Sequence, residues 1–110
     1  MIRRHNRCLG LRIWKWNRFQ CEVWFAPKEE FIEPHRHEQI DSKIIFLAGE
    51  MLGAIGERAG ILKWPKDIGR RFHVPAGVTH SALVGSFCVF ANVERWTNDP
   101  TSAAEDFTAV

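Results

Sequence analysis

The sequence predicts an all-β protein, a sandwich or barrel built from short strands. Most apolar segments alternate between two faces with a period of two, which is the pattern of half-buried strands. Gly, Pro and Asn interrupt these segments about every ten residues, as turns between strands require. The most helix-like run, ERAGIL at 57–62, is too short to change this picture. Short strands with regularly spaced turns are typical of sandwiches and barrels.

The first two strands are predicted over 11–16 and 20–26. LRIWKW and QCEVWFA both alternate, and both are rich in Trp and β-branched residues, which strands favour. Asn17 and Arg18 stand between them, so these two residues are predicted to form the turn of a hairpin.

The middle and the end of the chain continue the strand pattern. KIIFLAGEMLGAIG at 43–56 predicts one or two strands bent at Gly49 and Gly53, because a glycine inside a strand often marks a bulge or a corner. Three further short strands are predicted at RRFHV (70–74), HSALV (80–84) and SFCVFANVERW (86–96).

The length of 110 residues fits one domain with its own core. Residues 1–9 hold three arginines and a histidine before the strand pattern is established, and we interpret them as a solvated basic arm. Residues 10–96 form the predicted barrel. Residues 97–110 lose the alternation and predict a peripheral tail with one helical turn at 102–107.

Charge and cysteine content limit the function classes. Fifteen basic and thirteen acidic residues give a net charge of +2, so nucleic-acid binding is not expected. No apolar run approaches the roughly 20 residues of a membrane helix, and the start lacks the apolar stretch of a secretory signal. Cys8, Cys21 and Cys88 are scattered without a close pair, which indicates reduced thiols. A soluble, cytoplasmic protein is therefore expected.

Three histidines form the candidate site. In PHRHEQIDSK at 34–43, His35 and His37 lie on one face of a strand, because residues two apart point the same way. Alone, such a pair is more often a polar surface feature than a metal site. The segment GRRFHVPAGVTH at 69–80 changes that balance, since it predicts a tight turn that places His80 at the start of the next strand. Three histidines on facing strands suit zinc, iron, manganese, copper or nickel.

The two segments resemble the two motifs of the cupin superfamily. The residues that fit the second motif are Gly69, Pro75, Gly77 and His80. The residues that fit the first motif are His35, His37 and Gly49. The chain departs from the pattern at Val84, where Asn is usual, and at Glu29, where the first motif starts with Gly. The resemblance covers residues 10–96 and implies a cupin-type double-stranded β-helix, a jelly-roll barrel, with one divalent metal ion.

The first motif also implies a glutamate ligand that this sequence lacks. Counting back from Gly49 puts that position at Ser42, whose hydroxyl is a weak ligand, and the shorter permitted spacing puts it at Asp41. Cupins with three histidines and no carboxylate ligand exist, dioxygenases among them. Two ligand sets therefore stay open: the three histidines alone, which we favour, or the three histidines with Asp41.

Other polar residues are candidates for further roles. Asp41, Glu94 and His73 are the titratable groups that could be aimed at the metal. Arg71 shares the face of His73 and could bind a substrate carboxylate, although a solvated position suits both residues. Glu38 alternates away from the histidines, so a surface ion pair is favoured over catalysis for this residue.

Two function classes fit these features. The first is a metal-dependent enzyme, dioxygenase-like or of the lyase or isomerase type, that acts on a small organic molecule. The second is a non-catalytic module that binds a small molecule as a sensor or sequestering protein. A homodimer is expected, because so short a chain cannot hide five Trp and its N-terminal strands offer edges to a partner. The residues expected in the core or at that interface are Trp14, Trp16, Trp24 and Trp64.

Overall fold

The computed structural model of the protein describes residues 2–5, 7–97 and 107–109. Within these ranges the chain forms nine strands and no helix, as the alternation of its side chains predicts. The strands are β1 (Ile2–His5), β2 (Cys8–Trp16), β3 (Phe19–Ala26), β4 (Glu30–His37), β5 (Ile40–Ile55), β6 (Arg58–Lys63), β7 (Arg71–Val74), β8 (His80–Trp96) and β9 (Phe107–Ala109). The strand pairs are antiparallel throughout.

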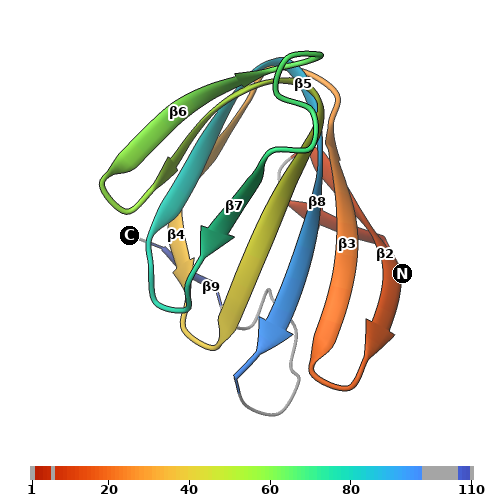
Figure 1. The fold of residues 1–110 in the computed structure, drawn as a ribbon, viewed down its shortest axis with the longest axis vertical. Helices are drawn as coiled ribbons and strands as arrows, with labels where there is room; N and C mark the ends of the chain where they lie inside the picture. The colour runs from red at the N-terminus through yellow and green to blue at the C-terminus, as the bar shows by residue number, and fades with distance from the viewer. Residues whose placement is uncertain (1, 6, 98–106, 110) are drawn as a thin grey trace.

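Two long strands, β5 and β8, pair with each other and run through both layers of the molecule. One layer, the β3 layer, contains β1, β2, β3, the second half of β8, the first half of β5 and β7. The other, the β4 layer, contains β9, β4, the first half of β8, the second half of β5 and β6. Figure 1 shows β2 and β3 on one side of β5 and β8, and β4 and β6 on the other.

Strand β5 bends at Gly49, where it passes from the β3 layer to the β4 layer. Its register against β8 shifts between Phe46 and Ala48 and again between Gly49 and Met51, so a bulge forms here. Gly49 has a φ of 95°, and a Cβ at this position would lie 2.0 Å from the carbonyl oxygen of Phe87. The bend predicted at Gly49 is confirmed.

Two local predictions were wrong. Gly53 lies in regular register between β6 and β8 and makes no corner. The short helix-like run at 57–62 forms no helix, since residues 58–62 are extended and pair with β5. Gly85 does not separate two strands, since β8 continues without a break from His80 to Trp96.

The two ends of the described chain both join the sheet. Residues Ile2–His5 pair with β2, so the backbone of this basic segment is part of the sheet. Its backbone groups find partners on a strand edge, while the side chain of Arg4 stays exposed. The hairpin turn predicted at Asn17 is confirmed, with a φ of 54° at that residue. Of the helical turn predicted at 102–107, all but Phe107 lies outside the described residues, and Phe107 begins β9.

The core lies between the inner faces of the two layers. Its buried members are Cys8, Ala26, Phe46, Met51, Leu62, Ala82, Val84 and Cys88.

The three cysteines are free thiols, as the sequence predicts, and burial raises the pKa of Cys88 to about 12. In the part of the chain that the structure describes, no helix is long and apolar enough to cross a membrane.

Candidate metal site

The three histidines singled out in the sequence come together at one end of the β4 layer. His35 and His37 lie at the end of β4, and His80 is the first residue of β8, directly opposite His35 in the ladder. One ring nitrogen from each of the three lies within 4.8 Å of the others. The ring centroid of His35 is 4.1 Å from that of His80 and 5.1 Å from that of His37.

The turn before β8 places His80 by means of its backbone. Gly77 has a φ of 82°, and the N–H of Val78 donates to the carbonyl of Pro75 at 3.2 Å, which closes the tight turn predicted from Pro75 and Gly77. The N–H of Gly77 donates to the carbonyl of His37 at 2.8 Å. The turn is therefore tied to the strand that carries the other two histidines.

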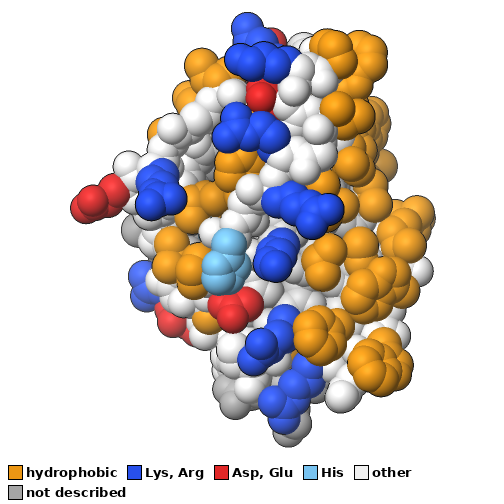
Figure 2. All heavy atoms as spheres, viewed as in Figure 1, with side chains coloured by type: hydrophobic (Ala, Val, Ile, Leu, Met, Phe, Trp, Pro, Cys, Tyr) orange, Lys and Arg blue, Asp and Glu red, His pale blue; other side chains and the backbone are white. Residues whose placement is uncertain are grey.

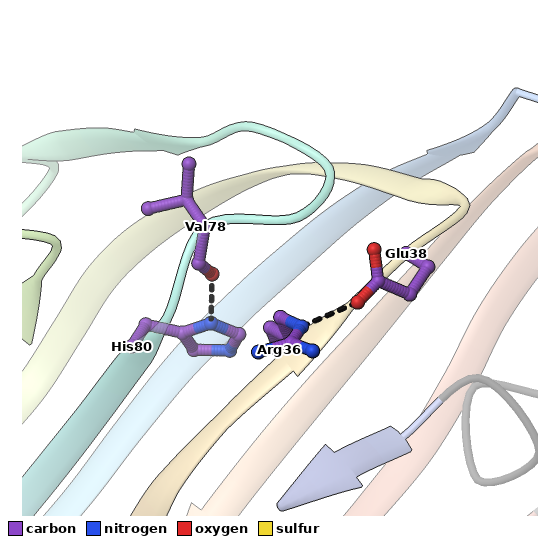
Figure 3. A network of polar contacts seen from close by, with 4 residues as sticks. All are labelled: Arg36, Glu38, Val78 and His80. Atoms are coloured by element: carbon purple, nitrogen blue, oxygen red, sulfur yellow. Dashed lines mark hydrogen bonds and ion pairs between the residues drawn. The ribbon is translucent and has the colours of Figure 1, made fainter. Parts of the chain in front are cut away.

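Backbone carbonyls fix the orientation of two of the rings. Nδ1 of His35 donates to the carbonyl of Glu33 at 2.8 Å, and Nδ1 of His80 donates to the carbonyl of Val78 at 3.4 Å (Figure 3). A carbonyl only accepts, so each Nδ1 carries the proton and Nε2 is the unprotonated nitrogen of the neutral ring. Metal-binding histidines are usually oriented in this way.

The electrostatics of the site favour the neutral rings that a metal needs. Burial, and next to it the neighbouring His35, lowers the pKa of His80 from 6.5 to about 4. Burial also lowers the pKa of His35, partly offset by its hydrogen bond to Glu33. Both rings are therefore neutral at pH 7. Two neutral imidazoles with oriented Nδ1 groups, together with His37 beside them, fit a divalent first-row metal such as zinc, iron, manganese, nickel or copper.

The structure does not bring Asp41 or Ser42 into this group. The carboxylate of Asp41 accepts the N–H of Ala76 at 2.7 Å, so it stabilises the turn that precedes His80. Ser42 is buried opposite Glu94 and Val74, and it lines a separate, smaller cavity of about 300 Å³. Among the described residues, the group of possible ligand atoms consists of the three histidines.

The histidines open onto a cavity of about 1090 Å³ between the two layers. Part of its lining is apolar and comes from both layers: Trp24, Ile32, Ile44, Leu62, Phe72 and Phe90. A volume of this size fits a small organic molecule, and an apolar lining with a few polar groups is typical of ligand sites.

Two buried carboxylates also line this cavity. Glu22 has an exposed fraction of 0% and Glu94 one of 2%, and Nδ2 of Asn92 donates to Oε1 of Glu94 at 3.1 Å. Glu94 was a candidate from the sequence, whereas Glu22 was missed. The alternation of QCEVWFA could have found it, because Glu22 shares its face with Trp24 and Ala26, which contribute to the core.

A fourth histidine, His5, lies beside the site and was not predicted. Its Nε2 is 3.0 Å from Oε1 of Glu33, and its ring centroid is 6.3 Å from that of His35. It reaches this place because β1 pairs with β2, which no local pattern in residues 1–9 indicates.

The other sequence candidates do not belong to the three-histidine group. Glu38 forms an ion pair with Arg36, as predicted (Figure 3). Arg71 and His73 are exposed on β7 and contribute to the rim of the cavity. The alternate residues of the strand, Phe72 and Val74, turn inward. Of the tryptophans, Trp24 packs against the core, whereas Trp14, Trp16 and Trp64 are exposed.

Known proteins match this chain through structure. No protein-family model and no curated protein sequence matches it. The Schizosaccharomyces pombe Cnp3 cupin domain superposes with a TM-score of 0.73 at 13% identity, over 83% of this chain and 62% of that chain. This chain thus spans less than two thirds of that structure.

Two further solved structures align with this chain over a larger share of their own length. KdgF from Halomonas sp. gives a TM-score of 0.76 at 13% identity, over 90% of this chain and 88% of that one. The polyketide cyclase RemF from Streptomyces resistomycificus gives 0.74 at 18% identity, over 96% and 72%. The strand order, the two shared long strands and these neighbours agree, and the protein has the cupin fold, a double-stranded β-helix.

Proposed function

We propose that the protein is a metal-dependent enzyme that acts on a small organic molecule. The observation that carries this proposal is the group of three imidazole nitrogens within 4.8 Å of one another at a cavity of about 1090 Å³. His35, His37 and His80 would hold the ion. A divalent metal in such a site acts as a Lewis acid that polarises a substrate oxygen or lowers the pKa of a bound water.

The buried carboxylates favour a lyase or isomerase over an oxygenase. Glu22 and Glu94 line the same cavity as the histidines, and a carboxylate in an enclosed site can take a proton from a substrate or return it. Asn92 holds Glu94 through its amide. Both carboxylates are buried, and burial strengthens their electrostatic effect on a bound molecule. Lyase and isomerase reactions of small organic acids commonly proceed through such proton transfers.

The neighbours support an enzyme on this scaffold. RemF is described as a polyketide cyclase, and it aligns with 96% of this chain. That likeness concerns the fold, so the reaction of this protein rests on its own residues.

Deuterium exchange tests the reaction class. Metal-loaded protein is incubated in heavy water with small 2-oxo and 2-hydroxy acids, and NMR follows the loss of substrate C–H signals, with oxygen uptake recorded in parallel. We expect exchange or turnover that disappears in His80→Ala and falls strongly in Glu22→Gln. Oxygen uptake without exchange would identify an oxygenase. Binding without exchange, turnover or oxygen uptake would identify the non-catalytic module.

We also propose a homodimer formed through the outer face of the β3 layer. Cross-strand pairs Leu9–Phe25 and Leu11–Val23 lie on this face, and Leu9, Leu11 and Phe25 are exposed. Figure 2 shows apolar side chains gathered along the side that β2 and β3 form in Figure 1. Extended apolar patches usually mark interfaces. A second copy is the partner that we propose, because β1 is also an edge strand of this layer and can meet its own copy about a two-fold axis.

The thiols support a reducing compartment such as the cytoplasm. Cys8, Cys21 and Cys88 are all free, and two of them are buried in the core. Proteins of oxidising compartments more often use their cysteines in disulfides.

A further inference from the structure

One cross-strand row of the β4 layer connects the histidines to Arg58. His35 lies opposite His80, His80 lies opposite Ile55, and Ile55 lies opposite Arg58. Residues that stand directly opposite each other in a sheet project from the same face. The row therefore places the Arg58 side chain on the face that carries the candidate metal ligands.

The burial pattern of β6 agrees with this placement. Leu62, four positions after Arg58 and on the same face, is buried in the core between the layers. Ile61, on the opposite face of β6, is exposed. Arg58 also contributes to the lining of the cavity. Its guanidinium thus belongs to the cavity side of the strand.

The separation along the row suits a small substrate. Arg58 is two strands away from His80, and adjacent strands are about 4.8 Å apart, so the two backbones are separated by roughly 10 Å. Both side chains extend into the cavity from these positions. A molecule of a few carbon atoms can therefore reach the histidines with one end and the guanidinium with the other.

The charges around the cavity also favour an anion. Arg4, Arg58, Arg70 and Arg71 contribute to its lining, whereas its acidic members, Glu22 and Glu94, are buried in the β3 layer. Arg70 is already engaged: Nη1 lies 3.4 Å from Oδ1 of Asp67, and its guanidinium lies 5.7 Å from the centre of the Phe72 ring. In the described part of the chain, no acidic side chain forms an ion pair with Arg58.

We propose that Arg58 binds the anionic end of the substrate and thereby makes the enzyme specific for small organic anions. The inference rests on the proposed function, because the other end of the substrate is placed at the three histidines. A guanidinium recognises a carboxylate or a phosphate through two parallel hydrogen bonds, and both groups share this chemistry. Arg58 is then a specificity-determining residue that the motif resemblance does not indicate.

Binding measurements with defined probes test this proposal. Isothermal titration calorimetry is carried out on zinc-loaded protein with malonate, succinate, glutarate and 2-phosphoglycolate, and with dimethyl succinate as the uncharged analogue. We expect at least one anion to bind, and its dissociation constant to rise roughly 10- to 100-fold in Arg58→Gln. Arg58→Lys should restore part of the loss. The ranking of 2-phosphoglycolate against the dicarboxylates tells which anionic group is preferred.

Lys63→Gln is the matched control. Lys63 lies on the same strand but not on the Arg58 face, and its substitution removes the same charge. We expect anion affinity in this variant to stay near that of the wild type, and metal content and melting temperature to be unchanged in both variants. Equal weakening in Arg58→Gln and Lys63→Gln, no weakening in Arg58→Gln, or no binding of any anion would overturn the proposal.

The outcomes separate this inference from the proposed function. If anions bind in an Arg58-dependent manner but no substrate is turned over, the anion site stands and the enzymatic function does not. If turnover depends on His80 but is the same in Arg58→Gln, the enzyme stands and the role of Arg58 is wrong.

Discussion

His35 lies directly opposite His80 in the β4–β8 ladder, with ring centroids 4.1 Å apart. Two neutral imidazoles held this close, with His37 beside them, predict one divalent metal ion per chain. The double variant His35→Ala/His80→Ala should lose the metal, because a single remaining imidazole cannot hold it. Elemental mass spectrometry on dialysed protein measures the content. The control is His73→Ala, which removes an exposed histidine outside the group. Full occupancy in the double variant would contradict the site.

The carboxylate of Asp41 accepts the N–H of Ala76, and we predict that it stabilises the turn and does not bind the metal. We expect Asp41→Ala to lower the free energy of unfolding by about 1 kcal/mol, because the partly buried N–H of Ala76 loses its acceptor. Asp41→Asn keeps an oxygen acceptor and should cost less. Neither variant should change metal affinity. Chemical denaturation and a metal-competition titration measure the two effects, and weaker metal binding by an Asp41→Asn protein of normal stability would show that Asp41 is a ligand.

The outer face of the β3 layer predicts a dimer that one charge can dissociate. Leu11 is 48% exposed and pairs with Val23 on this face, so Leu11→Glu should convert the dimer to a monomer. Light scattering after size exclusion reports the mass. Ile61→Glu is the control, because Ile61 is 61% exposed and lies on β6, in the β4 layer and not in the β3 layer that carries the proposed interface. A monomeric wild-type protein at micromolar concentration would end this proposal.

Gly49 and Gly60 should respond oppositely to the same substitution. A Cβ at Gly49 would lie 2.0 Å from a backbone oxygen, at a φ of 95°, so Gly49→Ala should destabilise the barrel by about 3 kcal/mol or more. At Gly60 a Cβ meets nothing within 4 Å, and Gly60→Ala should be neutral or slightly stabilising. Thermal unfolding of the two variants checks this. Similar melting temperatures would mean that the bulge at Gly49 can relax.

The buried thiol of Cys88 predicts both a reactivity and a pH effect. Its pKa rises from an ordinary value of 9.0 to about 12 through burial and the nearby Cys8, so the folded protein keeps it protonated where the unfolded chain does not. The free energy of unfolding should therefore be insensitive to this group below pH 9 and decrease as the pH rises above 9. Cys88→Ala should flatten that decrease. At pH 8, iodoacetamide should modify Cys88 only after denaturation, and rapid modification of the native protein would contradict its burial.

Much of the site was predictable because it depends on local chemistry. The spacing of Pro75 and Gly77 determines a tight turn by itself, and the turn determines where His80 enters β8. Likewise, two histidines one residue apart on a strand must share a face. These features are set within a dozen residues, so the pattern of the sequence carries them.

The missed features depend on partners that are distant in the sequence. Ile2–His5 form a strand because β2 offers an edge, and His5 therefore reaches Glu33. Residues 58–62 are extended because β5 pairs with them. The position of Arg58 on the histidine row follows from three successive ladders, none of which a local pattern specifies.

The long pairing of β5 with β8 has a kinetic consequence. It joins segments that are far apart along the chain, so much loop-closure entropy must be overcome before these contacts form, and folding should be slow for a protein of this size. The histidines on β4 and β8 meet through the pairing of those two strands, which also joins distant segments, so the unfolded chain has no assembled site. An ion that binds only the native state would stabilise it by about 2.7 kcal/mol at a hundredfold excess over its dissociation constant. A site that is completed after the rate-limiting step of folding would slow unfolding when it binds the ion and leave the folding rate unchanged, and folding and unfolding rates measured with and without zinc test this.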